Sequence, residues 1–276
     1  MFEASPQALE DLDRIAGELG IDLMLVGAGA RILVFDRPFG YQGRATMDWD
    51  VGVRLGGWPE FDRLVLAMTQ GADAPFEPTA TEHRFIHIQT ELPLDVVPFG
   101  GIARSDRTIR WPGDRGTEMS VVGFEEALAC AEEVSADSIA AERLKVVTLP
   151  GFVVLKLIAW SDRQAKKDLQ DVALILRWYE PDAIFDELAD ELASGAVEYD
   201  VAGAYLLGRE IRRGFGRSLV DVQSVVNVIL ERADREIAPL IETMSGDDSG
   251  WDAEFDRLKA KIEALLAGTF ESIFNS

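Results

Sequence analysis

The spacing of apolar residues changes near Phe152, and this change constrains the fold more than any other feature of the sequence. Before it, segments such as MDWDVGVRL alternate apolar and polar residues, which is typical of half-buried strands. After it, apolar residues recur every three or four positions with short glycine interruptions, which predicts helices. We therefore expect an α+β protein, with a mixed β-sheet flanked by helices in residues 1–150 and a mostly α-helical region in residues 151–276.

The same patterns predict the individual elements. Helices are expected over about 6–19 and 58–70, and strands over IDLMLV, MDWDVGVRL and both arms of RFIHIQTELPLDVVPFG. Beyond Gly123, FEEALACAEEV predicts a helix and RLKVVTLPG a strand that ends at Pro150. Residues 246–250, GDDSG, form the best predicted loop of the helical region.

Charge and hydropathy restrict the partners of the chain. A formal net charge of -22 disfavours broad electrostatic binding to nucleic acid or to anionic membranes. No run of eighteen apolar residues occurs, and the N-terminus lacks the basic and then apolar order of a signal peptide, so we expect a cytoplasmic protein with no membrane partner. Two arginine-rich stretches would allow a local RNA contact, or would simply balance the acidic surface: Arg104, Arg107, Arg110 and Arg115, and Arg209, Arg212, Arg213 and Arg217.

Two aspartates lie close together in the apolar stretch GRATMDWDVGV. In an extended strand, Asp48 and Asp50 project to the same face with their Cα atoms roughly 7 Å apart. Such a pair of like charges needs compensation, and Mg²⁺ or Mn²⁺ accepts this kind of all-oxygen ligation. Asp95, the only acid inside the apolar strand LPLDVVPFG, is the predicted third ligand. The alternative is that the acids face solvent from amphipathic strands.

A turn of small residues precedes this pair. In LMLVGAGARILV, a strand leads into Gly27, Ala28 and Gly29 and then into a predicted helix. Small residues allow a ligand to approach the backbone, and the N–H groups at a helix start favour phosphate. The order predicts that triphosphate and metal bind at adjacent points.

The order of these motifs resembles the nucleotidyltransferase superfamily with the polymerase-beta-like fold, and within it the AbiEii-type toxins of type IV toxin-antitoxin systems. The likeness covers about residues 20 to 180 and includes GAGAR, GRATMDWD, Asp95 and LKLIAWSDRQAKKDLQD. It implies a catalytic domain followed by a helical domain that completes the cleft, with Asp48, Asp50 and Asp95 as catalytic metal ligands. It also implies nucleotide-binding roles for Gly27, Ala28, Arg31, Arg44, Thr46, Lys156, Arg163, Lys167, Asp168 and Asp171. Two departures are Ala28, where glycine or serine is usual, and a longer stretch from Gly27 to Asp48 than compact members have.

The downstream motif requires a break in the helix. In one straight helix over 152–176, Lys156 and Asp171 would lie roughly 22 Å apart along the axis, too far to contact the same phosphate. A break near residues 161–164 would make Asp168 an early residue of a second helix, so that Asp168 and Asp171 orient Lys156 or Lys167. The alternative is a solvated helix face with ion pairs at three and four spacing.

The resemblance implies transfer of a nucleoside monophosphate from an NTP, such as ATP, to an acceptor hydroxyl with Mg²⁺ or Mn²⁺. The implied acceptor is RNA, such as tRNA, or a protein, and the implied protein partner is an antitoxin. A rival hypothesis, favoured by Ala28, is a non-catalytic module of the same fold that senses nucleotide or binds a partner. Another is a metal-dependent phosphohydrolase that uses the same acids.

Overall fold

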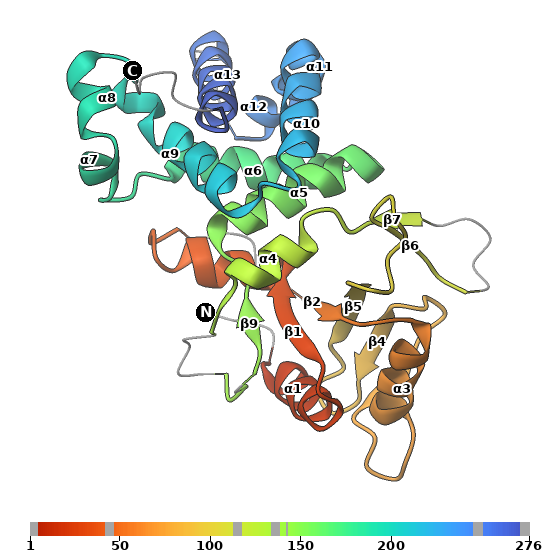
Figure 1. Cartoon of the computed structure of the whole chain (residues 1–276). Helices are drawn as coiled ribbons and strands as arrows, with labels where there is room; N and C mark the ends of the chain where they lie inside the picture. Colours follow the sequence, from red (N-terminus) through yellow and green to blue (C-terminus); the bar gives the residue numbers. More distant parts are fainter. Residues whose placement is uncertain are drawn as a thin grey trace. The chain divides into compact units, whose positions relative to one another are not determined.

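The computed structural model describes residues 5–41, 47–112, 118–133, 139–141, 143–244 and 251–270, without the side chains of 242–244. The chain divides into two compact units, residues 1–152 and 153–276. The first contains the described strands together with helices, and the second contains helices (Figure 1). The architecture is α+β, as the change in apolar spacing predicts.

A mixed sheet forms the core of the first unit. Its strands, in spatial order, are β3 (Phe76–Pro78), β4 (Arg84–His87), β5 (Pro93–Phe99), β2 (Trp49–Arg54), β1 (Asp22–Val26), β9 (Lys145–Val146) and β8 (Glu132–Glu133). The β2–β5 and β1–β9 pairs are parallel, and the other pairs are antiparallel. A separate ribbon pairs β6 (Thr108–Arg110) with β7 (Glu118–Ser120).

The helices of the first unit are α1 (Gln7–Leu19), α2 (Gly27–Arg31), α3 (Trp58–Thr69) and α4 (Phe124–Cys130), with a π-helical turn at Ile32–Asp36 after α2. The predicted alternation of β2 is confirmed, because Trp49, Val51 and Val53 are all fully buried. The indole Nε1 of Trp49 donates to the Ser5 carbonyl at 3.0 Å, just before α1. This alternation leaves Asp50 to project from the opposite face of β2.

The second unit is built of α5 (Leu149–Arg163), α6 (Lys166–Trp178), α7 (Ile184–Glu187), α8 (Ala189–Ser194), α9 (Tyr199–Gly214), α10 (Leu219–Glu231), α11 (Ala233–Glu236), α12 (Ala238–Met244) and α13 (Trp251–Gly268). Helices α9 and α13 contact each other through their backbones, since a Cβ atom added at Gly208 would lie 2.9 Å from the Cα of Gly268. In the described ranges, no helix has the length and apolar character needed to cross a lipid bilayer.

Two predictions around residues 124–150 are wrong in part. The helix expected over FEEALACAEEV ends at Cys130, because Glu132–Glu133 instead pair with β9. The strand expected to run to Pro150 is limited to Lys145–Val146, and Leu149 already begins α5. Proline is accommodated in a first helical turn because its missing N–H would have no intrahelical partner there. The predicted loop at 246–250 lies outside the described residues.

Candidate active site

Backbone pairing brings acids from separate segments together on one face of the sheet. In the parallel β2–β5 pair, Asp50 lies opposite Asp95. Neighbouring strands are about 4.8 Å apart, and residues in register project to the same side. Asp48 directly precedes β2, two positions before Asp50. Asp95 is buried, whereas Asp48 and Asp50 are half-buried.

Arg84 lies among these acids and was not singled out in the sequence. In the antiparallel β4–β5 pair, Arg84 is opposite Asp95. Its Nε donates to Asp95 Oδ1 at 2.7 Å and its Nη2 to Asp95 Oδ2 at 2.6 Å, while Nη2 also lies 3.6 Å from Asp48 Oδ2. The hydrogen bonds that Arg84 donates to Asp95 are the main cause that raises the pKa of Arg84, and the charges of Asp95, Asp48 and Asp50 add to it. One guanidinium therefore joins two of the predicted metal ligands.

The sequence does contain a signal for Arg84. The arms of RFIHIQTELPLDVVPFG form a hairpin, as expected, with Ile86 opposite Pro93 and Glu91 in the left-handed region at φ 57°. Counting outward from that turn places Arg84 opposite Asp95. The arginine is therefore recognisable once the hairpin is used to set the strand register.

Gly27 fits closely against Asp50. Helix α2 begins at Gly27 directly after β1, so the separate turn expected before the helix is absent. Gly27 has φ 65°, and a Cβ atom there would lie 2.6 Å from Cγ of Asp50. A Cβ atom at Gly29 would lie 2.7 Å from the ring of Trp49. Both glycines are therefore required by packing against β2.

The other predicted nucleotide-binding residues near α2 have different settings. Arg31 is 2% exposed, and its guanidinium donates to the Asp36 carboxylate at 3.2 to 3.3 Å across the π-helical turn. Ala28 is half-buried on α2, between the two closely packed glycines. Arg44 and Thr46 lie outside the described residues. The nucleotide contacts of all four stay predictions.

The acids match a divalent cation in chemistry but not in their present arrangement. Asp48, Asp50 and Asp95 offer only carboxylate oxygens, the ligands preferred by Mg²⁺ and Mn²⁺. Within the described ranges, however, no three acidic, histidine or cysteine side chains are placed so that they could hold a metal ion. Both oxygens of Asp95 accept from Arg84. Asp95 could therefore join the predicted metal ligands only if Arg84 released its carboxylate.

The second predicted cluster lies within the helical unit. The expected break is confirmed, because α5 ends at Arg163, Gln164 has φ 52° and α6 starts at Lys166. Across this break, Lys156 Nζ lies 2.7 Å from Asp171 Oδ2 and 3.4 Å from Asp168 Oδ1. Arg163 donates to both oxygens of Asp168 at 2.6 and 2.7 Å.

This cluster differs from a solvated helix face in its burial. Asp168 is fully buried and Asp171 is 5% exposed, whereas Lys167 is exposed. The two carboxylates hold the Lys156 ammonium between them and so fix α5 against α6. Whether these residues also bind nucleotide stays a prediction.

Replacing Lys156 by methionine should lower the free energy of unfolding by about 3 kcal/mol, since it removes the ammonium that the buried Asp168 and Asp171 carboxylates share. Lys259→Met is the matched control, because Lys259 pairs with Glu263 at 3.9 Å on the surface and should cost less than about 1 kcal/mol. Urea denaturation of both variants measures the difference. Equal destabilisation would contradict a structural role for the Lys156 cluster.

Several arginines of the two arginine-rich stretches pair with neighbouring acids. Ion pairs join Arg104 to Glu118 at 2.7 Å, Arg209 to Glu191 at 3.0 Å and Arg213 to Glu187 at 2.8 Å. Arg115 lies outside the described residues. These pairs match the interpretation that the arginines balance acidic surface, and an RNA contact through them stays a prediction.

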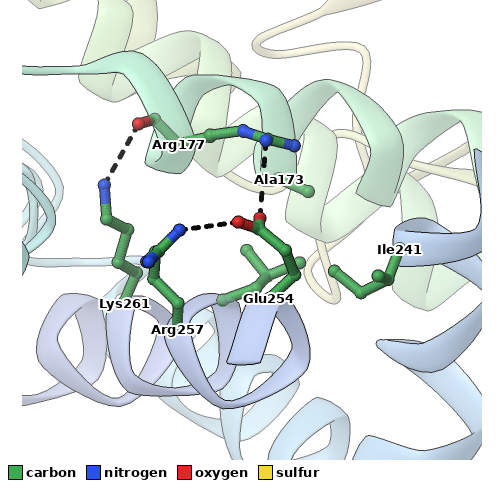
Figure 2. A pocket seen from close by; sticks show the side chains of 7 residues that line it. Ala173, Arg177, Ile241, Glu254, Arg257 and Lys261 are labelled. Atoms are coloured by element: carbon green, nitrogen blue, oxygen red, sulfur yellow. Dashed lines mark hydrogen bonds and ion pairs between the residues drawn. The ribbon is translucent and has the colours of Figure 1, made fainter. Parts of the chain in front are cut away.

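A small cavity in the helical unit is lined by Ala173, Arg177, Ile241, Glu254, Arg257, Leu258 and Lys261 (Figure 2). Its volume of about 20 Å³ has room for a water molecule, but not for a nucleotide. Glu254 accepts from Arg257 at 2.6 Å and lies 3.4 Å from Arg177, and Lys261 Nζ donates to the Arg177 carbonyl at 3.1 Å. Burial lowers the pKa of Lys261. The ion pairs of this cavity connect α6 to α13 and leave no substrate site there.

Comparison with known proteins adds a family match. The family model described as "Nucleotidyl transferase AbiEii toxin, Type IV TA system" matches residues 37–274, which include all three acids and the Lys156 cluster. No curated protein matches the chain significantly. Among solved structures, the Thermotoga maritima CCA-adding enzyme complexed with tRNA aligns over 99% of this chain and 86% of that chain, with 13% identity and a TM-score of 0.24. A similarity at that level supports no conclusion about this chain.

Proposed function

We propose that this chain, which belongs to the family of AbiEii nucleotidyl transferase toxins of type IV toxin-antitoxin systems, uses Mg²⁺ or Mn²⁺ in its reaction. As a nucleotidyltransferase, it would move a nucleoside monophosphate from an NTP to an acceptor hydroxyl. The observation that carries the proposal is the register of Asp50 opposite Asp95 on neighbouring parallel strands. It explains why acids far apart in the sequence share one face.

The reaction needs positioning and charge compensation. The acceptor oxygen forms a bond to the α-phosphorus, the bond from that phosphorus to the bridging oxygen breaks, and pyrophosphate leaves with the electron pair. A bound divalent cation would supply compensation for the phosphate charge. Acids held on a rigid sheet keep their geometry during the reaction, which favours such transfer.

The three acids have different roles in this proposal. Asp48 and Asp50, half-buried at the start of β2, bind the cation and orient the triphosphate. Asp95, the buried member, would also hold the cation, and it accepts the proton of the acceptor hydroxyl after Arg84 has released its carboxylate. Gly27 keeps the Asp50 carboxylate in place, because no larger side chain fits between them.

The family match supports a proposal for the acceptor and for the protein partner. We propose an RNA, such as tRNA, or a protein as the acceptor, and an antitoxin as the protein that restrains the enzyme. With a net charge of -22, the chain should contact RNA over a short stretch only.

Incubation of the purified protein with α-labelled NTPs, total RNA and Mg²⁺ or Mn²⁺ tests the proposal. Transfer of label to RNA or to protein, with release of pyrophosphate, is the expected result. Release of inorganic phosphate without transfer would indicate a phosphohydrolase. Nucleotide binding with neither product would indicate a non-catalytic module.

A further inference from the structure

Arg84 lies between two of the acids that the proposed function assigns to the cation. Its planar guanidinium matches both oxygens of Asp95, the strongest kind of arginine–carboxylate pairing, and it approaches Asp48 at 3.6 Å.

The surroundings of Arg84 permit it to leave. Its side chain is 40% exposed, whereas that of Asp95 is 12% exposed. The carboxylate is thus fixed in the sheet, while the arginine reaches it from the solvent side on a long, flexible stem. Breaking the pair returns the guanidinium to water, where its hydration replaces the lost hydrogen bonds.

We propose that Arg84 is an internal competitor of the divalent cation, which holds Asp95 and Asp48 together before the metal binds and must release Asp95 when it does. This inference rests on the proposed function, because it concerns the same acids. It explains why the three acids have the carboxylate oxygens that a divalent cation prefers but, within the described ranges, are not placed to bind one together. Arg84 is in this view a positioning residue that sets the metal concentration at which the enzyme becomes active.

Titration of the full-length protein with Mn²⁺ alone, followed by calorimetry or by electron paramagnetic resonance, measures the competition. Arg84→Gln removes the competing charge and should lower the Kd for Mn²⁺ at least tenfold. Arg84→Lys keeps the charge but loses the bidentate contact with Asp95. Its Kd for Mn²⁺ should therefore lie between those of the glutamine variant and the native protein. A merely structural arginine would instead leave Mn²⁺ affinity unchanged or weaken it when replaced.

Arg54→Gln is the matched control. Arg54 lies at the other end of β2 and pairs with Asp22 at 3.7 Å and with Glu125 at 3.3 Å, so this variant loses the same charge away from the acids. Its Kd for Mn²⁺ should stay within twofold of the native value. A Kd that falls equally in both glutamine variants would overturn the inference, since net charge alone would then explain it.

The outcomes separate this inference from the proposed function. If the native protein transfers nucleotide but neither Arg84 variant tightens Mn²⁺ binding, competition is disproved and the function stands. If the native protein neither binds Mn²⁺ nor transfers nucleotide, both are disproved. A folded Arg84→Lys variant, checked by circular dichroism, gives the answer even if Arg84→Gln does not fold.

Discussion

Replacing Asp50 by asparagine is expected to lower the rate of nucleotidyl transfer roughly a thousandfold, which is the upper range for loss of one preorganised electrostatic group. The substitution keeps the shape of the side chain and removes its charge beside Asp95. Asp50 lies directly opposite Asp95 in the β2–β5 pair, and the proposed site depends on this pairing. Transfer of α-label from NTP under saturating Mg²⁺ measures the effect.

Asp22→Asn provides the control for this experiment. Asp22 lies on the neighbouring strand β1, its side chain is 55% exposed, and it pairs with Arg54. Its replacement should leave the transfer rate within twofold of the native value. If the Asp50 variant keeps activity within tenfold of the native value, Asp50 has no essential role in the transfer.

Replacing Gly27 by alanine should reduce transfer at least a hundredfold, with a loss of stability of about 2 kcal/mol. Part of the loss arises from φ 65°, a conformation that costs a residue with a Cβ atom about 1 to 2 kcal/mol. The rest arises because the new methyl group would meet the Asp50 carboxylate and push it out of position. Thermal unfolding and the transfer assay report the two effects separately.

Gly20→Ala isolates the backbone contribution. Gly20 follows α1 with φ 71°, and a Cβ atom there would have no neighbour within 4 Å. This variant should lose about 1 kcal/mol of stability and keep native activity. If both alanine variants lose activity equally, the close approach of Gly27 to Asp50 has no functional role.

The sequence predicted those features that depend on local pattern. The alternation in MDWDVGVRL correctly separates buried Trp49 from Asp50, and the break near residues 161–164 follows from the need to join Lys156 to Asp171. Both are short-range arguments about which face of a strand or which turn of a helix a residue occupies.

Features that depend on long-range pairing were harder to predict. Arg84 belongs to an ordinary amphipathic strand, and its importance emerges only from the register that sets it against Asp95. Arg31 follows the small residues Gly27 to Ala30, where a phosphate-binding arginine is expected. It instead donates to Asp36 across a π-helical turn, and the spacing of apolar residues does not reveal such a turn. The two-residue strand Lys145–Val146 is too short to be recognised from its own sequence, and it is defined by its pairing with β1 and β8.

The distance between Asp50 and Asp95 is fixed by main-chain hydrogen bonds between β2 and β5, not by the residues that connect these strands. Loops tolerate insertion and exchange far better than the elements they join. Changes in the segments that connect the strands of such an AbiEii protein should therefore leave the spacing of these two carboxylates unaltered.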